Sequence, residues 1–313
     1  MNWKEITKLQ SSDMNVCKFV FKSDNAIAEA VLYKYPTYEE RTVICCSVMS
    51  GCPVGCRFCG TGEYFVRNLT SSEIISQVVE LLKSANIDGN SIKKFQIMFM
   101  SMGEPMLNWK NVKISLIELH KLYPNAALLI STSGPSVDYN DLISLSKEIP
   151  QIGLQFSVHE STDEVRNKLV PFKDKLTLSQ IGEYGYKFYV ETGRMPFFNY
   201  CVHDKNNLIE DAQRLVELFD PKVFQATISV ICERDESIAK ANERQLELAL
   251  NFTQLLNNCG YSTRTFNPAG QDDIGGGCGM LHNVQKWIKE NPDKVKNSIG
   301  FGMEKVHTPC IKN

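Results

Sequence analysis

Short apolar runs alternate with longer amphipathic stretches along most of the chain, starting near residue 42. Each run is rich in β-branched and aromatic residues and is bounded by turn-forming residues, a pattern typical of strands. The predicted strands are residues 42–49, 93–102, 125–134, 152–160, 195–203 and 224–232.

The stretches between these runs have the periodicity of amphipathic helices. In residues 71–86, an apolar stripe recurs every three or four positions, as the core-facing side of a helix requires. The same spacing recurs in residues 207–220 and 243–258, and Gly260 offers a stop after the latter.

Six strands that are each followed by a helical crossover predict a parallel sheet. Because a complete barrel of this kind needs eight units, the sequence predicts an α/β fold with a partial (β/α)6 TIM-like barrel. Polar residues gather where three strands end, at 101–105, 131–134 and 157–160. Ligands bind at the carboxyl ends of the strands in such folds, so these loops are expected to form one site.

No repeat, low-complexity tract or long linker interrupts the pattern. We expect residues 1–41 to form a short N-terminal extension packing on the barrel and residues 42–265 to form the barrel. Residues 266–313 are expected to form a C-terminal segment with a cysteine-containing loop and a terminal helix.

Composition narrows the class of protein. The 313 residues are 43% hydrophobic and 22% charged, with a net charge of −2, so any nucleic-acid binding has to rely on a local basic patch. The start of the chain has no apolar signal region, and no run approaches membrane-spanning length. We therefore expect a soluble, cytoplasmic protein without membrane partners, whose eleven cysteines are mostly reduced.

Three of those cysteines, Cys52, Cys56 and Cys59, share the loop "SGCPVGCRFCGTG" at residues 50–62. A structural zinc site takes four ligands, usually as two separated pairs, and no second pair is near. A disulfide would leave an odd thiol in a reducing compartment. Three thiolates can hold a [4Fe–4S] cluster and leave one iron open to an external ligand, which is the interpretation we favour.

The C-x3-C-x2-C spacing, with Phe58 before the last cysteine, resembles the radical S-adenosylmethionine (radical SAM) superfamily. Further stretches are similar to one branch of it, the adenine-C2 RNA methyltransferases and their C8-methylating resistance relatives, the RlmN/Cfr family. These stretches are "CGTGEYFVRNLTSSEIISQV", "MSMGEPMLN", "STSG", "FSVHESTDEVRNKLVP" and "DDIGGGCG". The resemblance implies a partial barrel of the radical SAM type, a [4Fe–4S] cluster held by the three loop cysteines, and S-adenosyl-L-methionine (SAM).

The resemblance also implies the residues that hold SAM. Gly103 and Glu104 would bind its ammonium group, and Ser131, Ser157 and His159 would contact the adenosyl moiety. Glu104 has an alternative as an acid at a helix N-terminus. His159 has an alternative as a satisfied histidine at a strand end.

Two cysteines and one glutamate would carry the methyl transfer. By resemblance, Cys278 accepts a methyl group from one SAM, a second SAM supplies the radical, and the methylated cysteine adds to an adenine carbon. Cys278 lies among glycines, which fits a mobile loop better than a core position. Cys45 would resolve the covalent adduct, with Cys46 as its neighbour on the opposite face of the strand. Glu29 would be a proton acceptor.

Three features depart from the family pattern. The N-terminal helical domain is largely absent, "VICERDES" lacks an asparagine that contacts SAM, and "FNPAGQDDI" replaces a basic run. The expected partners are an RNA, rRNA or tRNA, and a reductant such as flavodoxin or ferredoxin. Two rivals remain, namely a radical SAM enzyme acting on a small molecule or peptide, with SAM only as a radical source, and a non-enzymatic binding protein with a vestigial site.

Overall fold

The computed structural model of the chain describes residues 3–229, 238–266 and 274. The strands are β1 (Glu5–Gln10), β2 (Val16–Ser23), β3 (Ala26–Lys34), β4 (Arg41–Cys46), β5 (Met49–Gly51), β6 (Phe65–Asn68), β7 (Lys94–Phe99), β8 (Ala126–Thr132), β9 (Ile152–Ser157), β10 (Phe197–Cys201), β11 (Gln225–Ser229) and β12 (Thr263–Phe266). The α-helices are α1 (Ser71–Ser84), α2 (Trp109–Leu122), α3 (Asn140–Glu148), α4 (Asp163–Leu169), α5 (Leu178–Thr192), α6 (Ile209–Leu218) and α7 (Ile238–Asn258). Short 3-10 helices are η1 (Gly60–Glu63), η2 (Gly89–Ser91) and η3 (Pro105–Asn108).

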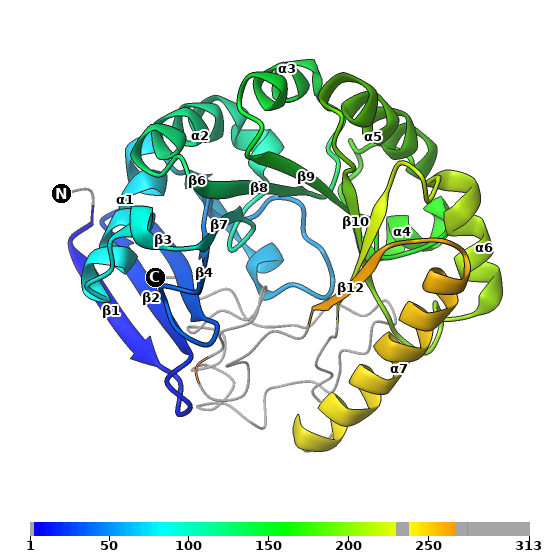
Figure 1. Cartoon of the computed structure of the whole chain (residues 1–313), viewed down its shortest axis with the longest axis horizontal. Coiled ribbons are helices and arrows are strands. Elements are labelled where there is room, and N and C mark those ends of the chain that lie inside the picture. The colour runs from blue at the N-terminus through cyan, green and yellow to red at the C-terminus, as the bar shows by residue number, and fades with distance from the viewer. Residues whose placement is uncertain (1–2, 230–237, 267–273, 275–313) are drawn as a thin grey trace.

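One sheet of ten strands organises the described part of the chain, in the order β1-β2-β3-β4-β7-β8-β9-β10-β11-β12. From β4 to β12 all neighbours pair in parallel, and the sheet curves into an open barrel (Figure 1). The predicted α/β partial barrel is thus confirmed, and β4, β7, β8, β9, β10 and β11 are the six predicted strands. A seventh parallel strand, β12, was not predicted, because its four residues carry no apolar run.

The N-terminal residues continue this sheet. Strands β1, β2 and β3 pair antiparallel with one another, and β3 pairs antiparallel with β4. The hydrogen-bonded ladder therefore runs without a break past residue 42, where the sequence suggested a boundary.

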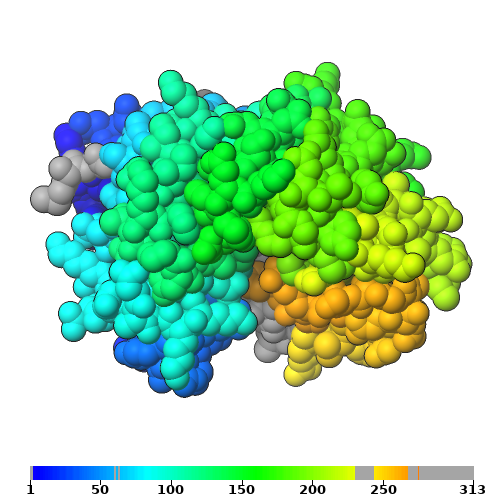
Figure 2. Space-filling view, turned by 45° about the horizontal axis from the view of Figure 1, so that its top comes forward, coloured from blue at the N-terminus to red at the C-terminus, as the bar shows by residue number. Residues whose placement is uncertain are grey.

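Helices cover the outer, convex face of the barrel. Figure 1 shows α1, α2, α3, α5 and α6 outside the strands, and Figure 2 shows successive segments side by side over that face in chain order. Alternate strand residues such as Ile97, Leu128 and Phe156 are fully buried beneath these helices in the largest apolar cluster. Burying this face against the helices supplies most of the apolar driving force for folding.

The remaining strand residues point to the inner, concave face. There the strands carry a smaller apolar cluster around Val31, Val43 and Cys45, together with polar side chains such as Gln155 and Thr227. Among the described helices, none has the length and apolar character needed to cross a membrane.

Candidate active site

The three-cysteine loop is the connection of a small hairpin formed by β5 and β6. Its base is closed by a hydrogen bond of 2.8 Å from the Cys52 amide to the Tyr64 carbonyl oxygen. Gly51 sits there with φ +80°, and a Cβ at this position would lie 2.2 Å from that oxygen. The position therefore requires glycine, and the backbone can turn tightly into the loop.

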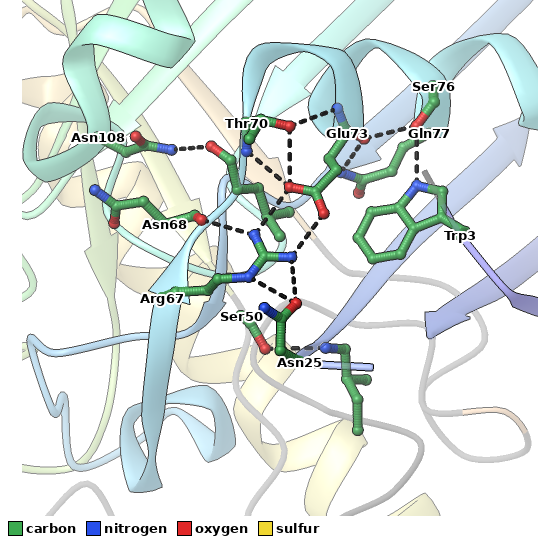
Figure 3. A network of polar contacts seen from close by, with 12 residues as sticks. Trp3, Asn25, Ser50, Arg67, Asn68, Thr70, Glu73, Ser76, Gln77 and Asn108 are labelled. Carbon is green, nitrogen blue, oxygen red and sulfur yellow. Dashed lines mark hydrogen bonds and ion pairs between the residues drawn. The ribbon is translucent and has the colours of Figure 1, made fainter. Parts of the chain in front are cut away.

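A polar network anchors this hairpin to the start of α1 (Figure 3). The Arg67 guanidinium donates two bonds, of 2.7 and 2.9 Å, to the Glu73 carboxylate, and it also donates to Asn25 Oδ1. Glu73 is the third helical residue of a capping box, in which Thr70 and Glu73 satisfy each other's backbone amides. The strand that follows the cysteine loop is thus anchored by a bidentate ion pair and a helix cap.

Cys52, Cys56 and Cys59 are half-buried. Burial raises the pKa of the Cys52 and Cys56 thiols far above the ordinary value, and the negative charges of the neighbouring thiolates and of Glu104 add to this. Three thiolates this close repel one another in a desolvated loop, so they suit a site in which bound iron supplies positive charge.

The same loop also fits a cluster better than a single ion. Among the described residues, no three His, Cys, Asp or Glu side chains converge as ligands of one metal ion. A [4Fe–4S] cluster does not need such convergence, because each thiolate binds a different iron. Phe58 packs with Val54, Leu169 and Val170 into an apolar wall beside the thiols.

His159 lies against this wall. Its ring meets that of Phe58 edge-on, with the ring centroids 4.8 Å apart, and its backbone has the unusual φ of 64°. Burial, and secondarily the charge of Arg166, lowers the pKa of His159 to about 3, so the imidazole is neutral near pH 7. Its buried Nδ1 has no hydrogen-bond partner. An unpaired polar atom in this position is suited to a ligand that the structure does not contain.

Glu104 follows β7, and both oxygens of its carboxylate accept hydrogen bonds from other residues of the protein. One oxygen accepts bonds from the Met106 amide and the Thr132 hydroxyl, and the other accepts from the amide and hydroxyl of Ser133. Four donors fill the acceptor positions of the carboxylate. The side chain caps η3, as the alternative interpretation from the sequence proposed, and it ties the loop after β7 to the end of β8.

Gly103 precedes Glu104 and lies close to Met49. Its φ is +96°, and a Cβ would lie 2.5 Å from the Cβ of Met49 at the start of the cysteine hairpin. The turn after β7 and the cysteine hairpin therefore touch through a glycine.

Ser131 and Ser157 lie at the ends of β8 and β9, half-buried, and Ser131 Oγ accepts a bond of 3.1 Å from Gln155 Nε2. The structure thus brings the cysteine loop and the predicted SAM-binding residues to the carboxyl ends of neighbouring parallel strands.

Sequence reasoning gave no role to Arg166, which organises these loops from α4. The side chain is fully buried and donates to the carbonyl oxygens of Ser133, Ser157, Val158 and Leu176. Its only signal in the sequence was an arginine within "STDEVRNKLVP". Four carbonyl contacts cannot be inferred from that stretch.

Cys45 and Cys46 point to opposite faces of β4. Cys46 lies in the outer cluster, where complete burial raises the pKa of its thiol to about 12. Cys45 lies in the inner cluster, with its Sγ 3.9 Å from Met98 Sδ.

Glu29 shares the inner face through β3, where Val31 pairs with Cys45. Its carboxylate is 2.6 Å from Lys18 Nζ, and both side chains are at most 2% exposed. The predicted proton acceptor is therefore a member of a buried ion pair, a feature that the sequence did not indicate.

Cys278 lies outside the described residues. Ile274, which is described and is four residues earlier in the chain, packs against the inner cluster that contains Cys45.

Comparisons with known proteins agree on one family. The model of the Radical SAM superfamily matches residues 46–189. A protein of Thermotoga neapolitana described as a probable dual-specificity RNA methyltransferase RlmN is 31% identical to this chain, over 90% of this chain and 79% of the relative. The dual-specificity RNA methyltransferase RlmN of Aliarcobacter butzleri is 32% identical, over 88% and 79%. The crystal structure of a radical SAM methyltransferase from Sphaerobacter thermophilus matches with a TM-score of 0.73 and 27% identity, over 90% of this chain and 81% of that one.

Proposed function

The chain belongs to the RlmN family of radical SAM methyltransferases, and from this premise we propose that it methylates an sp2 carbon of RNA, with C2 of an adenine as the favoured acceptor. As a radical SAM enzyme it uses a [4Fe–4S] cluster and SAM. When bound, these two groups supply the methyl group and a 5′-deoxyadenosyl radical. The roles of the chain's own residues follow from where they lie.

The cluster would be held by Cys52, Cys56 and Cys59, and SAM at the adjacent strand ends. His159 offers an unpaired Nδ1, and Ser131 and Ser157 offer hydroxyl groups to the adenosyl moiety. The turn at Gly103 and Glu104 would receive the ammonium group. Because the Glu104 carboxylate already accepts four bonds, we assign the direct contact to backbone oxygens of that turn and the electrostatic attraction to the buried carboxylate.

Methyl transfer would proceed through two cysteines. The Cys278 thiolate would accept a methyl group from SAM by displacement, with S-adenosylhomocysteine as the leaving group. Its S-methyl group would then give up a hydrogen atom and carry its carbon to the adenine. Cys45 would resolve the adduct between Cys278 and the RNA. After the adduct loses one electron to the cluster and the proton of the adenine carbon to Glu29, the Cys45 thiolate would attack the Cys278 sulfur, so that an S–S bond forms as the S–C bond to the RNA breaks and the released carbon takes up a proton. Two SAM molecules are used in each turnover.

The observation that carries this proposal is the contact of Ile274 with the apolar cluster around Cys45. This contact brings Ile274, which precedes Cys278 by four residues in the sequence, to the inner face of β4. With at most about 14 Å of chain between Ile274 and Cys278, the two cysteines can act on one substrate.

Glu29 is proposed as the proton acceptor, and the free energy needed to protonate it depends on its ion pair with Lys18. Protonation of the carboxylate would leave the ammonium group of Lys18 without its partner in a buried place. The role therefore requires the pair to separate when the substrate is bound. A small electron-transfer protein such as flavodoxin or ferredoxin is the proposed reductant, and the cytoplasm is the proposed compartment.

The test compares three cysteine variants of the anaerobically reconstituted enzyme. Cys278→Ala should keep the cluster and SAM binding but transfer no methyl group. Cys45→Ala should accumulate a covalent enzyme–RNA species, because the radical adds before resolution is needed. Cys46→Ala, next to Cys45 on the outer face, is the matched control and should remain active.

The acceptor is identified by mass spectrometry of the trapped species and of nucleosides from cells with and without the gene. Methyl transfer by Cys278→Ala would rule out the carrier role. A trapped small molecule or peptide instead of RNA would support a different substrate for the same chemistry. Activity without S-methylcysteine would support a radical SAM reaction in which SAM is only the radical source.

A further inference from the structure

Two arginines on the inner face of the barrel have no carboxylate partner among the described residues. Arg41 is the first residue of β4, and Arg264 is the second residue of β12, six positions away in the order of the sheet. No Asp or Glu of the described residues forms an ion pair with either guanidinium. In contrast, Arg67, Arg214 and Arg244 each pair with an acid.

Neutral acceptors and aromatic rings hold both guanidinium groups in place. Arg41 donates two bonds, of 3.1 and 3.2 Å, to Gln96 Oε1 and lies 4.8 Å from the centre of the Tyr35 ring. These contacts orient the cation but leave its charge uncompensated.

Arg264 is held in the same way. It donates to Thr227 Oγ1 at 2.8 Å and to Gln155 Oε1 at 3.3 Å, and it lies 4.1 Å from the centre of the Phe197 ring. Because Gln155 belongs to β9, the Arg264 side chain extends from β12 across the inner face of the barrel, past β11 and β10. The same Gln155 donates to Ser131, which we assign to SAM.

Both guanidinium groups point into the same concave face, where Arg41 contacts Gln96 of β7 and Arg264 contacts Gln155 of β9, and only β8 lies between these two strands. Burial among protein atoms lowers the pKa of Arg264, and the positive charge of Arg41 lowers it further. The side chain of Arg264 is nonetheless exposed to solvent. An anion can approach a cation that is partly surrounded by protein atoms and still exposed, and the lower local dielectric strengthens the attraction.

We propose that Arg41 and Arg264 together form an anion site on the inner face of the barrel, and that this site holds one backbone phosphate of the RNA next to the nucleotide that is methylated. The inference rests on the proposed function, because it takes the acceptor to be RNA. Planar guanidinium forks bind phosphate oxygens in pairs, and two of them without acids are suited to one phosphate group.

The position along the strands agrees with this role. Arg41 and Cys45 both face inward on β4 and are four residues apart, which is about 13 Å along a strand. This separation allows one arrangement in which the adenine lies beside Cys45 and its phosphate lies at the arginine pair. Tyr35 stacks near Arg41 and offers a ring to a neighbouring base, as in proteins that bind single-stranded RNA.

The site also compensates for a departure noted in the sequence. The chain has a net charge of −2 and lacks a basic run before its "DDI" motif. One phosphate held inside the barrel positions the substrate without a broad basic surface. This site should therefore contribute a large share of the total free energy of RNA binding.

The test measures binding of a short single-stranded RNA with one adenine to the reconstituted enzyme over a range of salt concentrations. Arg41→Gln and Arg264→Gln should each weaken binding about tenfold and reduce the slope of log K against log salt by about 0.7, the value for one phosphate of a single strand. The double variant should lose little more than either single variant, because both arginines bind one phosphate. Arg244→Gln, whose partner is Asp204, is the control and should bind like the wild type.

A second arm changes the RNA. Replacing the phosphate beside the adenine with a neutral methylphosphonate should weaken binding to the wild type but not to the double variant. An unchanged salt slope in both arginine variants, with RNA still methylated, would overturn the anion site and leave the proposed function intact. If the wild type neither binds nor methylates RNA, the proposed function fails. In that case, calorimetry with sulfate tests the anion site independently of RNA. Equal heats of sulfate binding to the wild type and to the double variant would overturn the site.

Discussion

The outer and inner faces of the barrel are built from alternate residues of the same strands, yet they follow different rules. On the outer face, Ile97, Phe99 and Cys46 are completely buried in one apolar cluster under the helices. On the inner face, a buried ion pair of Lys18 and Glu29 lies on the sheet surface that also carries Cys45. The outer face accounts for most of the stability, whereas the inner face carries charges and polar groups that a purely structural sheet would not contain.

The two adjacent cysteines of β4 show the difference at the level of single residues. Cys46 has complete burial, a thiol pKa of about 12 and a contact of 3.6 Å with a carbonyl oxygen, so it is chemically inert near neutral pH. Cys45 faces the sulfur of Met98 and the cluster that Ile274 completes. A one-residue change of register would exchange them, so the register of β4 against β7 is a requirement of the chemistry.

The largest effect on stability is expected at the buried ion pair. Lys18→Met removes the ammonium group and leaves the Glu29 carboxylate buried beside an apolar side chain. We expect a loss of about 3–5 kcal/mol in the free energy of unfolding, measured with urea. The double variant Lys18→Met with Glu29→Leu should recover most of it, because no charge then remains unpaired. A double variant as unstable as the single one would show that the pair is not the source of the effect.

A smaller effect on stability is expected for substitutions at two neighbouring residues of β7, Ile97 and Met98. Ile97→Ala opens a cavity in the outer cluster and should cost about 2–5 kcal/mol of stability. Met98→Ala, on the half-buried inner face, should cost about half as much. The order should reverse for activity, because Met98 contacts Cys45. Urea unfolding and methyl transfer of both variants test this, and equal losses of stability would contradict the division into two faces.

The outer face was largely predictable from the sequence. Six apolar runs and the helical stripe that begins at Ile74 predicted the parallel strands and their covering helices, because burial imposes periodicity. The strand β12 was missed, because "TRTF" lies at the edge of the described sheet and has no apolar pattern. The antiparallel strands before residue 42 were not recognised as part of the sheet, although each pairs with the next strand along the chain.

The candidate site was predictable only in part. The cysteine loop was identified by its spacing and its residue types, and the turn at Gly103 by its motif. The partners of these residues were not predictable. Lys18 opposite Glu29, Arg166 beneath the loops after β8 and β9, and Arg264 reaching Gln155 all join residues far apart in the chain. Such contacts depend on the tertiary fold, and no local pattern encodes them.

The smallest effect concerns His159, whose environment at the barrel mouth differs from both faces. The folded-state pKa of about 3 lies below the ordinary value of 6.5, because burial and Arg166 disfavour the charged imidazole. The unfolded chain therefore takes up a proton below pH 6.5 that the folded protein does not. This contribution to stability is complete above pH 6.5 and is lost as the pH falls toward the folded-state pKa, at about 1.4 kcal/mol per pH unit. His159→Asn also tolerates a positive φ and lacks this titration, so the wild type should lose about 1 kcal/mol more than the variant between pH 6.5 and 5.5, because half of the unfolded imidazole is already protonated at pH 6.5. Urea unfolding of the cluster-free protein at both pH values measures the difference, and an equal loss in the two proteins would show that the imidazole is protonated in the folded state.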